Sequence, residues 1–211
     1  MTETSTSKER PILFNGEMVR AILEGRKTQT RRPVKPPNGI CHECFMAATP
    51  HNGSECAMKP GPYLRVAFCE HNQATGRRME APMSIGDRLW VREILIPVDK
   101  HAANGATRGT WLYYKADHSP VPGNHRAIKV VPSIHMPRWA SRITLEITDV
   151  RVQRLQEING VDIRAEGVKD ALCHTLSGVP VSFAELWDST YPKLPWSENP
   201  WVWAYTFRRL T

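Results

Sequence analysis

The sequence predicts an α+β fold, in which a small, partly open β-barrel is flanked by short helices and carries a Cys-containing loop insertion. Two observations predict it: strand-like segments follow one another in an antiparallel-looking succession, and short helical segments lie at their ends. The 211 residues can bury one good core. We expect a disordered leader at 1–10 and a single domain at 11–211, with the insertion at about 38–83.

The first elements are a short extended segment and an amphipathic helix. Residues 11–14 are expected to be extended, and Asn15 has the side chain of an N-cap for a helix that runs through Glu24. Gly25 then ends the helix. The predicted inner face consists of Met18, Val19, Ile22 and Leu23.

A strongly basic strand follows the helix. Residues 25–32 hold four cations and two hydroxyl groups, and Pro33 stops the segment. A strand used only for packing would alternate apolar side chains on at least one face, which this segment does not do. It is therefore either a solvated edge, kept charged against strand pairing, or the wall of a site that handles something anionic.

The segment at 38–83 has little periodicity and contains most of the cysteines. A structureless loop of this length is unusual in a compact domain, so we expect an insertion with its own small organisation or a flexible flap. Two hypotheses apply to its cysteines: a structural zinc site, or free thiols. The zinc ligands would be Cys41, Cys44, Cys56 and Cys69.

Three strands and an irregular segment are predicted in the middle of the chain. The strands cover 88–94, 111–115 and 142–152, and Asp149 marks a bend in the last of them. An irregular segment at 134–139 separates the second strand from the third.

The C-terminal third is predicted to be helical and then extended. A short helix covers 159–167, and a capping box at 182–185 starts a second helix that runs to about Tyr191. Residues 201–209 alternate as a final core strand. Trp187, Trp201 and Trp203 are expected in the core.

Composition limits the class of partner. The formal charge of +7 and the pI near 9.3 favour a polyanion, because Lys and Arg release counterions from phosphates. No segment has the apolar core of a signal peptide, and no apolar run reaches the ~18 residues that span a bilayer. We therefore expect a cytoplasmic protein without a membrane partner. Five cysteines without an export signal argue against a disulfide framework.

Several motifs together resemble the ASCH domain of the PUA-like superfamily. They are the basic segment at 25–32, the strand at 86–91 and the segment at 165–168. The strand at 90–93, the segment at 135–142 and the ending at 199–203 are similar to ASCH-like proteins of tailed phages and prophages. This resemblance covers most of the chain from Pro11 to Leu210, but the insertion departs from the small cellular members.

The resemblance implies a PUA-like barrel with a cleft for a nucleoside or RNA. Small bacterial ASCH proteins hydrolyse the acetyl amide of 4-acetylcytidine with a Lys, a Thr and a Glu. The motif pattern falls here on Gly25, Lys27, Thr30 and Arg32, and the best match for the Glu is Glu166. The implied activity is that of an amidohydrolase that needs no cofactor.

This chemistry requires Lys27 and Thr30 to share a site. Thr30 would supply the nucleophilic hydroxyl, Lys27 would act as its base, and Glu166 would orient the Lys or accept a hydrogen bond from the cytosine amine. Side chains alternate along a strand, so positions 27 and 30 point to opposite faces unless the chain bends just after Gly25.

Four arginines and one tryptophan are expected to bind the substrate: Arg31, Arg32, Arg92, Arg138 and Trp139. Alternatively, Arg92 forms a structural ion pair with Glu93, and Trp139 covers the core. A different class of function, an RNA- or DNA-binding module without chemistry, would use the same cations for phosphates and Trp139 to stack a base. A virion assembly factor is a third hypothesis.

Overall fold

We analysed a computed structural model of the chain. It describes residues 7–35, 49–51, 63–66, 77–101, 107–117, 125–127, 129–168 and 181–211. The chain divides into two compact units, each built from separate stretches of sequence. Unit 1 comprises Met1–Arg26, Gly86–Glu146 and Arg208–Thr211, and unit 2 comprises Lys27–Ile85 and Ile147–Phe207.

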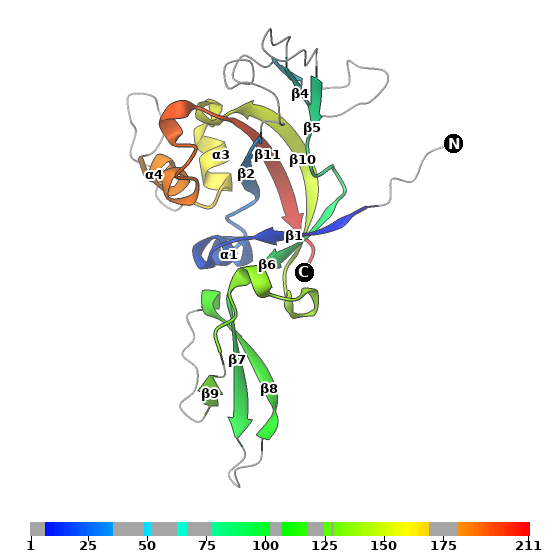
Figure 1. The fold of residues 1–211 in the computed structure, drawn as a ribbon, viewed down its shortest axis with the longest axis vertical. Helices are drawn as coiled ribbons and strands as arrows, with labels where there is room; N and C mark the ends of the chain where they lie inside the picture. Colours follow the sequence, from blue (N-terminus) through cyan, green and yellow to red (C-terminus); the bar gives the residue numbers. More distant parts are fainter. Residues whose placement is uncertain are drawn as a thin grey trace, which may run out of the picture. The chain divides into compact units, whose positions relative to one another are not determined.

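The predicted α+β class is confirmed. The largest sheet has five strands in the order β1-β6-β10-β11-β2, and Figure 1 shows β10 and β11 as two long strands side by side. Its edges are β1 and β2, so the described strands form an open sheet and no closed barrel. The strands are β1 Glu9–Leu13, β2 Gln29–Pro33, β6 Arg88–Arg92, β10 Thr144–Arg154 and β11 Trp201–Arg209.

In unit 1, β1 pairs in parallel with β6, from Glu9 opposite Arg88 to Leu13 opposite Arg92. The backbone N–H of Lys8 also donates to the Asp87 carboxylate at 3.0 Å. Strand β1 thus begins inside residues 1–10, for which disorder was predicted. The prediction is wrong for Glu9 and Arg10. The pairing with a strand almost eighty residues away orders Glu9 and Arg10.

The helix expected from Asn15 is α1, Gly16–Leu23. The Asn15 side chain accepts a hydrogen bond from the backbone N–H of Met18 at 2.8 Å, as an N-cap does. Val19 and Ile22 are buried as predicted. Gly25 follows with φ +74°, a left-handed conformation that glycine adopts without strain.

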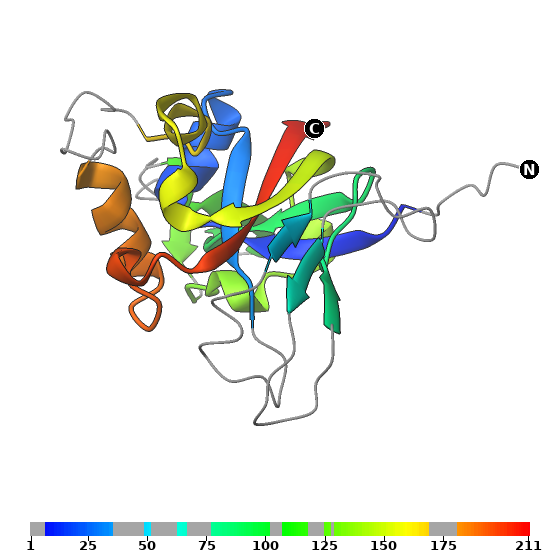
Figure 2. The same cartoon turned by 90° about the horizontal axis from the view of Figure 1, so that it is seen from above.

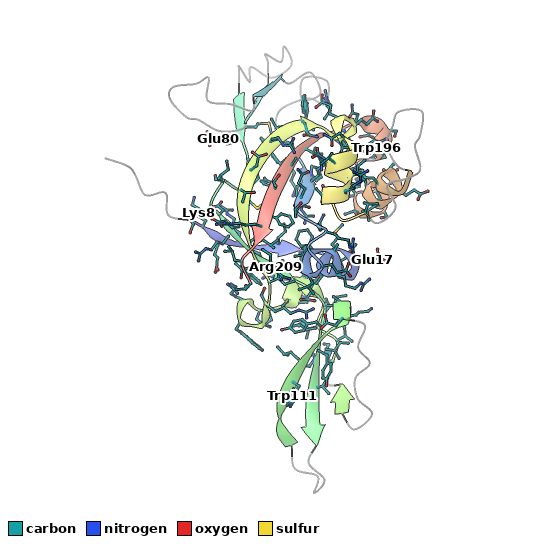
Figure 3. All side chains as sticks on the ribbon, turned by 180° about the vertical axis from the view of Figure 1, so that it is seen from behind. Lys8, Glu17, Glu80, Trp111, Trp196 and Arg209 are labelled. Carbon is teal, nitrogen blue, oxygen red and sulfur yellow. The ribbon has the colours of Figure 1, made fainter. Side chains whose placement is uncertain are left out.

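Unit 1 also contains a second sheet, with the order β8-β7-β9. Figure 1 shows β7 and β8 as a long hairpin, and Trp111 lies on β8 in Figure 3. Short 3-10 turns follow, and two of them occupy the segment that was predicted to be irregular. The bounds are β7 Leu95–His101, β8 Thr107–Tyr114, η1 Lys115–Asp117, β9 His125–Ala127, η2 Ser133–His135 and η3 Arg138–Ala140.

In unit 2, antiparallel pairing joins β11 to β2, with Thr30 opposite Tyr205. Helices α3 and α4 form an apolar cluster in which Ile163, Phe183 and Trp187 pack with Val202 of β11. Trp196, labelled in Figure 3, meets Phe183 edge to face at 5.9 Å. The bounds are η4 Leu155–Glu157, α3 Gly160–Ala165, α4 Val181–Thr190 and η5 Trp196–Glu198.

The described part of the insertion forms a three-stranded antiparallel sheet, β3-β4-β5, whose short strands Figure 2 draws in blue-green. The strands are β3 Thr49–His51, β4 Tyr63–Val66 and β5 Arg77–Glu80. In the described residues, no helix has the length and apolarity to cross a membrane.

Candidate functional site

The site is built at the start of β2. After Gly25, the chain is extended, and Lys27 forms an isolated antiparallel bridge with Glu166, the C-cap of α3. The backbone N–H of Thr28 donates to the carbonyl of Ala165 at 2.7 Å, and the N–H of Phe207 donates to the carbonyl of Thr28 at 2.8 Å. The segment is therefore held between the end of α3 and strand β11.

Lys27 and Glu166 form a buried ion pair. The Lys27 Nζ donates to Glu166 Oε2 at 2.6 Å and to the Glu166 carbonyl at 2.9 Å. The Lys27 side chain has no exposed surface, and 7% of the Glu166 side chain is exposed. The structure thus brings together two of the three residues that were predicted to be catalytic.

Arg31 of β2 joins the same network. Its NH1 group donates to Glu166 Oε1 at 3.0 Å and to Gln29 Oε1 at 3.2 Å. Its NH2 group donates to Asp162 Oδ2 at 2.7 Å. Only 1% of the Arg31 side chain is exposed, and its two terminal nitrogens donate to the protein's own acceptors.

Burial and neighbouring charges act on Lys27 in opposite directions. Burial lowers the pKa of Lys27 below its usual value of 10.5, since the charged form loses its hydration. The Glu166 carboxylate raises this pKa in part, while Arg32 and Arg31 lower it further. The net effect is a lysine that loses its proton more readily than an exposed one.

Thr30 lies on the other face of β2. Strand alternation separates Thr30 and Arg32 from Gln29 and Arg31, and Lys27 reaches the same carboxylate as Arg31. The Arg32 NH1 group donates to the Tyr191 hydroxyl at 2.8 Å. The glycine bend is present, but the alternation does not direct Thr30 toward the Lys27–Glu166 pair.

Arg92, Arg138 and Trp139 all lie in unit 1, and the first two contact the ring of Trp90. The guanidinium carbons of Arg92 and Arg138 lie 4.6 and 5.8 Å from the ring centroid of Trp90. Arg138 also donates two hydrogen bonds to the Glu9 carboxylate, and this contact lowers the pKa of Glu9. Trp139 is 76% exposed, so it does not cover the core.

The expected ion pair between Arg92 and Glu93 is wrong. Glu93 is buried and accepts from Arg142 at 2.9 and 3.0 Å, while Arg92 donates to the carbonyl of Ile134 at 3.1 Å. Strand β6 ends at Arg92, and Glu93 follows it and pairs with Arg142 instead. Arg142 also donates to Asp117, and this second pair was not predicted.

The predicted zinc ligands Cys41, Cys44, Cys56 and Cys69 lie outside the described residues, so zinc binding stays a prediction. Among the described residues, no group of three or more His, Cys, Asp or Glu side chains is arranged to hold a metal ion.

Sequence reasoning missed Asp162. A signal was available, because Asp162 and Glu166 are four residues apart on the predicted helix at 159–167 and therefore share a helix face. The carboxylates of this face meet Arg31 and Lys27.

Comparisons with protein-family models, curated proteins and solved structures gave no match to this chain.

Proposed function

We propose that the protein is a cytoplasmic amidohydrolase, with a PUA-like fold, that removes the acyl group from 4-acetylcytidine or a related modified nucleoside. The observation that carries this proposal is the contact between Lys27 Nζ and Glu166 Oε2, 2.6 Å apart in a buried setting. A lysine whose pKa is lowered, beside a carboxylate, can take and return a proton more readily than an exposed lysine.

The reaction adds water across the acyl amide. Neutral Lys27 takes a proton from water as the oxygen attacks the acyl carbon, and Glu166 stabilises the ammonium group that forms. The carbon–nitrogen bond then breaks, the proton passes to the leaving cytosine amine, and the acyl group leaves as a carboxylic acid. Because the Lys27 side chain has no exposed surface, neighbouring side chains must move to admit the substrate.

Water is the proposed nucleophile because Thr30 belongs to the face of β2 that also carries Arg32. The resemblance to ASCH proteins implies instead that the Thr30 hydroxyl attacks. The two routes differ in what they require: removing the hydroxyl abolishes the second route and leaves the first intact.

Incubation with 4-acetylcytidine, followed by chromatography of the products, tests the proposal. The wild-type chain should release cytidine, and Lys27→Ala and Glu166→Gln should lose this activity. Glu157→Gln, an exposed carboxylate near Glu166 in sequence, is the matched control and should retain it. Retained activity in Thr30→Val supports water as the nucleophile, whereas loss of activity in a folded Thr30→Val supports the hydroxyl.

A second candidate function is nucleic-acid binding without chemistry. The observation that favours it is the exposed ring of Trp139, adjacent in sequence to Arg138, whose guanidinium lies near Trp90. Exposed aromatic rings stack on bases, and nearby cations hold phosphates. A binding module predicts that Trp139→Ala weakens binding of a single-stranded oligonucleotide in a fluorescence titration while 4-acetylcytidine stays intact with the wild-type chain.

A further inference from the structure

The Glu166 carboxylate is held from two sides. Its Oε2 atom accepts from Lys27 at 2.6 Å, and its Oε1 atom accepts from Arg31 at 3.0 Å. A carboxylate with only one partner can rotate about its last bond. With a donor on each oxygen, the Glu166 carboxylate has a fixed plane, and the oxygen that faces Lys27 is determined.

Arg31 is fixed in turn by a second carboxylate. Its NH2 group donates to Asp162 Oδ2 at 2.7 Å, while its NH1 group donates to the side chains of Glu166 and Gln29. The planar guanidinium can join two carboxylates only in a defined relative orientation. The position of Asp162 therefore constrains the position of the Glu166 carboxylate through Arg31.

Helix α3 sets the position of Asp162. Asn159 caps the helix, and its side chain accepts from the backbone N–H of Asp162 at 2.9 Å. The backbone N–H of Glu166 donates to the carbonyl of Asp162 at 2.9 Å, so one helical turn joins the two carboxylates. Their four-residue spacing directs both toward Arg31 of β2 and toward Lys27, which precedes this strand.

We infer that Arg31 and Asp162 are positioning residues for the Lys27–Glu166 pair. Arg31 holds the second oxygen of Glu166, and Asp162 holds Arg31. The inference rests on the proposed amidohydrolase function and extends it to two residues that would touch neither the substrate nor the reacting atoms. It also gives Arg31 a role different from the substrate binding that the sequence predicts.

Substitutions of Asp162 and Arg31 should have opposite effects on the protonation of Lys27. Glu166 and Asp162 come from α3, Arg31 and Arg32 come from β2, and Arg151 of β10 lies 3.5 Å from Asp162 Oδ1. Removing the negative charge of Asp162 leaves Arg31 less neutralised and favours the neutral form of Lys27. Removing Arg31 takes away a cation and favours the charged form.

The pH profile of kcat/KM for 4-acetylcytidine tests the inference in the full chain. The limb on which activity rises with pH reports Lys27 losing its proton. Asp162→Asn should move this limb by about one unit to lower pH, and Arg31→Gln should move it by about one unit to higher pH. Arg164→Gln, which removes an exposed cation from the same helix, should leave the limb in place.

A purely structural role would lower the amount of folded enzyme and leave the limb where it is in all variants, and that result overturns the inference. Circular dichroism identifies variants that do not fold. If Asp162→Asn or Arg31→Gln does not fold, Arg151→Gln replaces it. The Arg151 side chain is 36% exposed, so its substitution should disturb folding less. It removes a cation from the same network and should move the limb to higher pH by less than Arg31→Gln; an unmoved limb in this folded variant also contradicts the inference.

A titration of Lys27 itself separates this inference from the proposed function. The NMR resonance of the carbon next to Nζ, followed against pH in wild type and variants, should show the same opposite shifts without any substrate. A wild-type chain that leaves 4-acetylcytidine intact overturns the proposed function. Unchanged Lys27 titration in folded Asp162→Asn and Arg151→Gln overturns the inference, even where the wild-type chain is active.

Discussion

The Nζ atom of Lys27 lies 2.6 Å from Oε2 of Glu166, although 139 positions separate the two residues in the sequence. The antiparallel bridge between the same residues aligns their backbones, so the contact follows from the fold and not from long side chains alone. Both side chains are buried. The pair therefore affects both the stability of the chain and the chemistry proposed for it.

Neutralising Glu166 should destabilise the fold. Glu166→Gln leaves Lys27 and Arg31 as buried cations with one carboxylate fewer, and breaking a buried pair in this way costs about 3–5 kcal/mol. The free energy of unfolding in urea measures this cost. Glu185→Gln, an exposed carboxylate on α4, is the control and should stay near the wild-type value. Equal stability of the two variants would contradict the importance of the pair.

Stability should rise with pH on the alkaline side. Burial lowers the pKa of Lys27 in the folded state below 10.5, so between the lowered value and 10.5 the unfolded chain binds more protons than the folded chain. The free energy of unfolding then increases with pH across this window, and the contribution is lost as pH falls through the folded pKa. Guanidinium unfolding at several pH values should show this slope in the wild type and a smaller slope in Lys27→Met. Identical slopes would refute the lowered pKa.

The Arg142–Glu93 and Arg138–Glu9 ion pairs of unit 1 should differ in their contribution to stability. Arg142→Met leaves the Glu93 carboxylate, 2% exposed, without its bidentate partner, and an unpaired buried charge costs about 3–5 kcal/mol. Arg138→Met removes the exposed partner of Glu9 and should leave the unfolding free energy within error of the wild type. Thermal denaturation of both variants makes the comparison, and a larger loss in Arg138→Met would argue against it.

The cap of α3 should influence the site. Asn159→Ala removes the acceptor for the Asp162 backbone N–H and should cost about 1 kcal/mol of stability. Because Asp162 sits in the first turn, its hold on Arg31 should loosen as well, and kcat/KM for 4-acetylcytidine should fall. Asn15→Ala removes the equivalent cap of α1 in unit 1 and is the control. It should cost similar stability and leave kcat/KM unchanged.

Two tryptophans that look alike in the sequence should respond differently to truncation. Trp203→Ala empties a 3% exposed site on β11 and should cost about 3–5 kcal/mol. Trp139→Ala removes a 76% exposed ring and should leave stability unchanged. Urea unfolding of both variants gives the comparison.

Local patterns predicted the helices and the longest strands. Asn15 and Asn159 marked the starts of α1 and α3, and the alternation after Trp201 gave the bounds of β11. The alternation of side chains did not predict that both faces of β11 are buried over its first five residues. Trp201 to Tyr205 are all buried, because the strand lies between β10 and β2 and its Val202 packs against the helices.

Non-local pairing accounts for part of what the sequence did not predict. Glu9 and Arg10 are polar, and only their parallel pairing with β6 makes them part of a strand. The site was likewise predicted only in part. The resemblance indicated Lys27 and Glu166, and the four-residue spacing places Asp162 on the same helix face as Glu166. That this face meets Arg31 of β2 depends on non-local packing.

The rate of 4-acetylcytidine hydrolysis by the wild-type chain and by Lys27→Ala tests the central claim most directly. We predict that the wild type releases cytidine and acetate and that Lys27→Ala, confirmed as folded, is slower by about 100-fold or more, the usual contribution of a general acid–base group. A wild-type chain that leaves 4-acetylcytidine intact, or a Lys27→Ala variant with the wild-type rate, would contradict it.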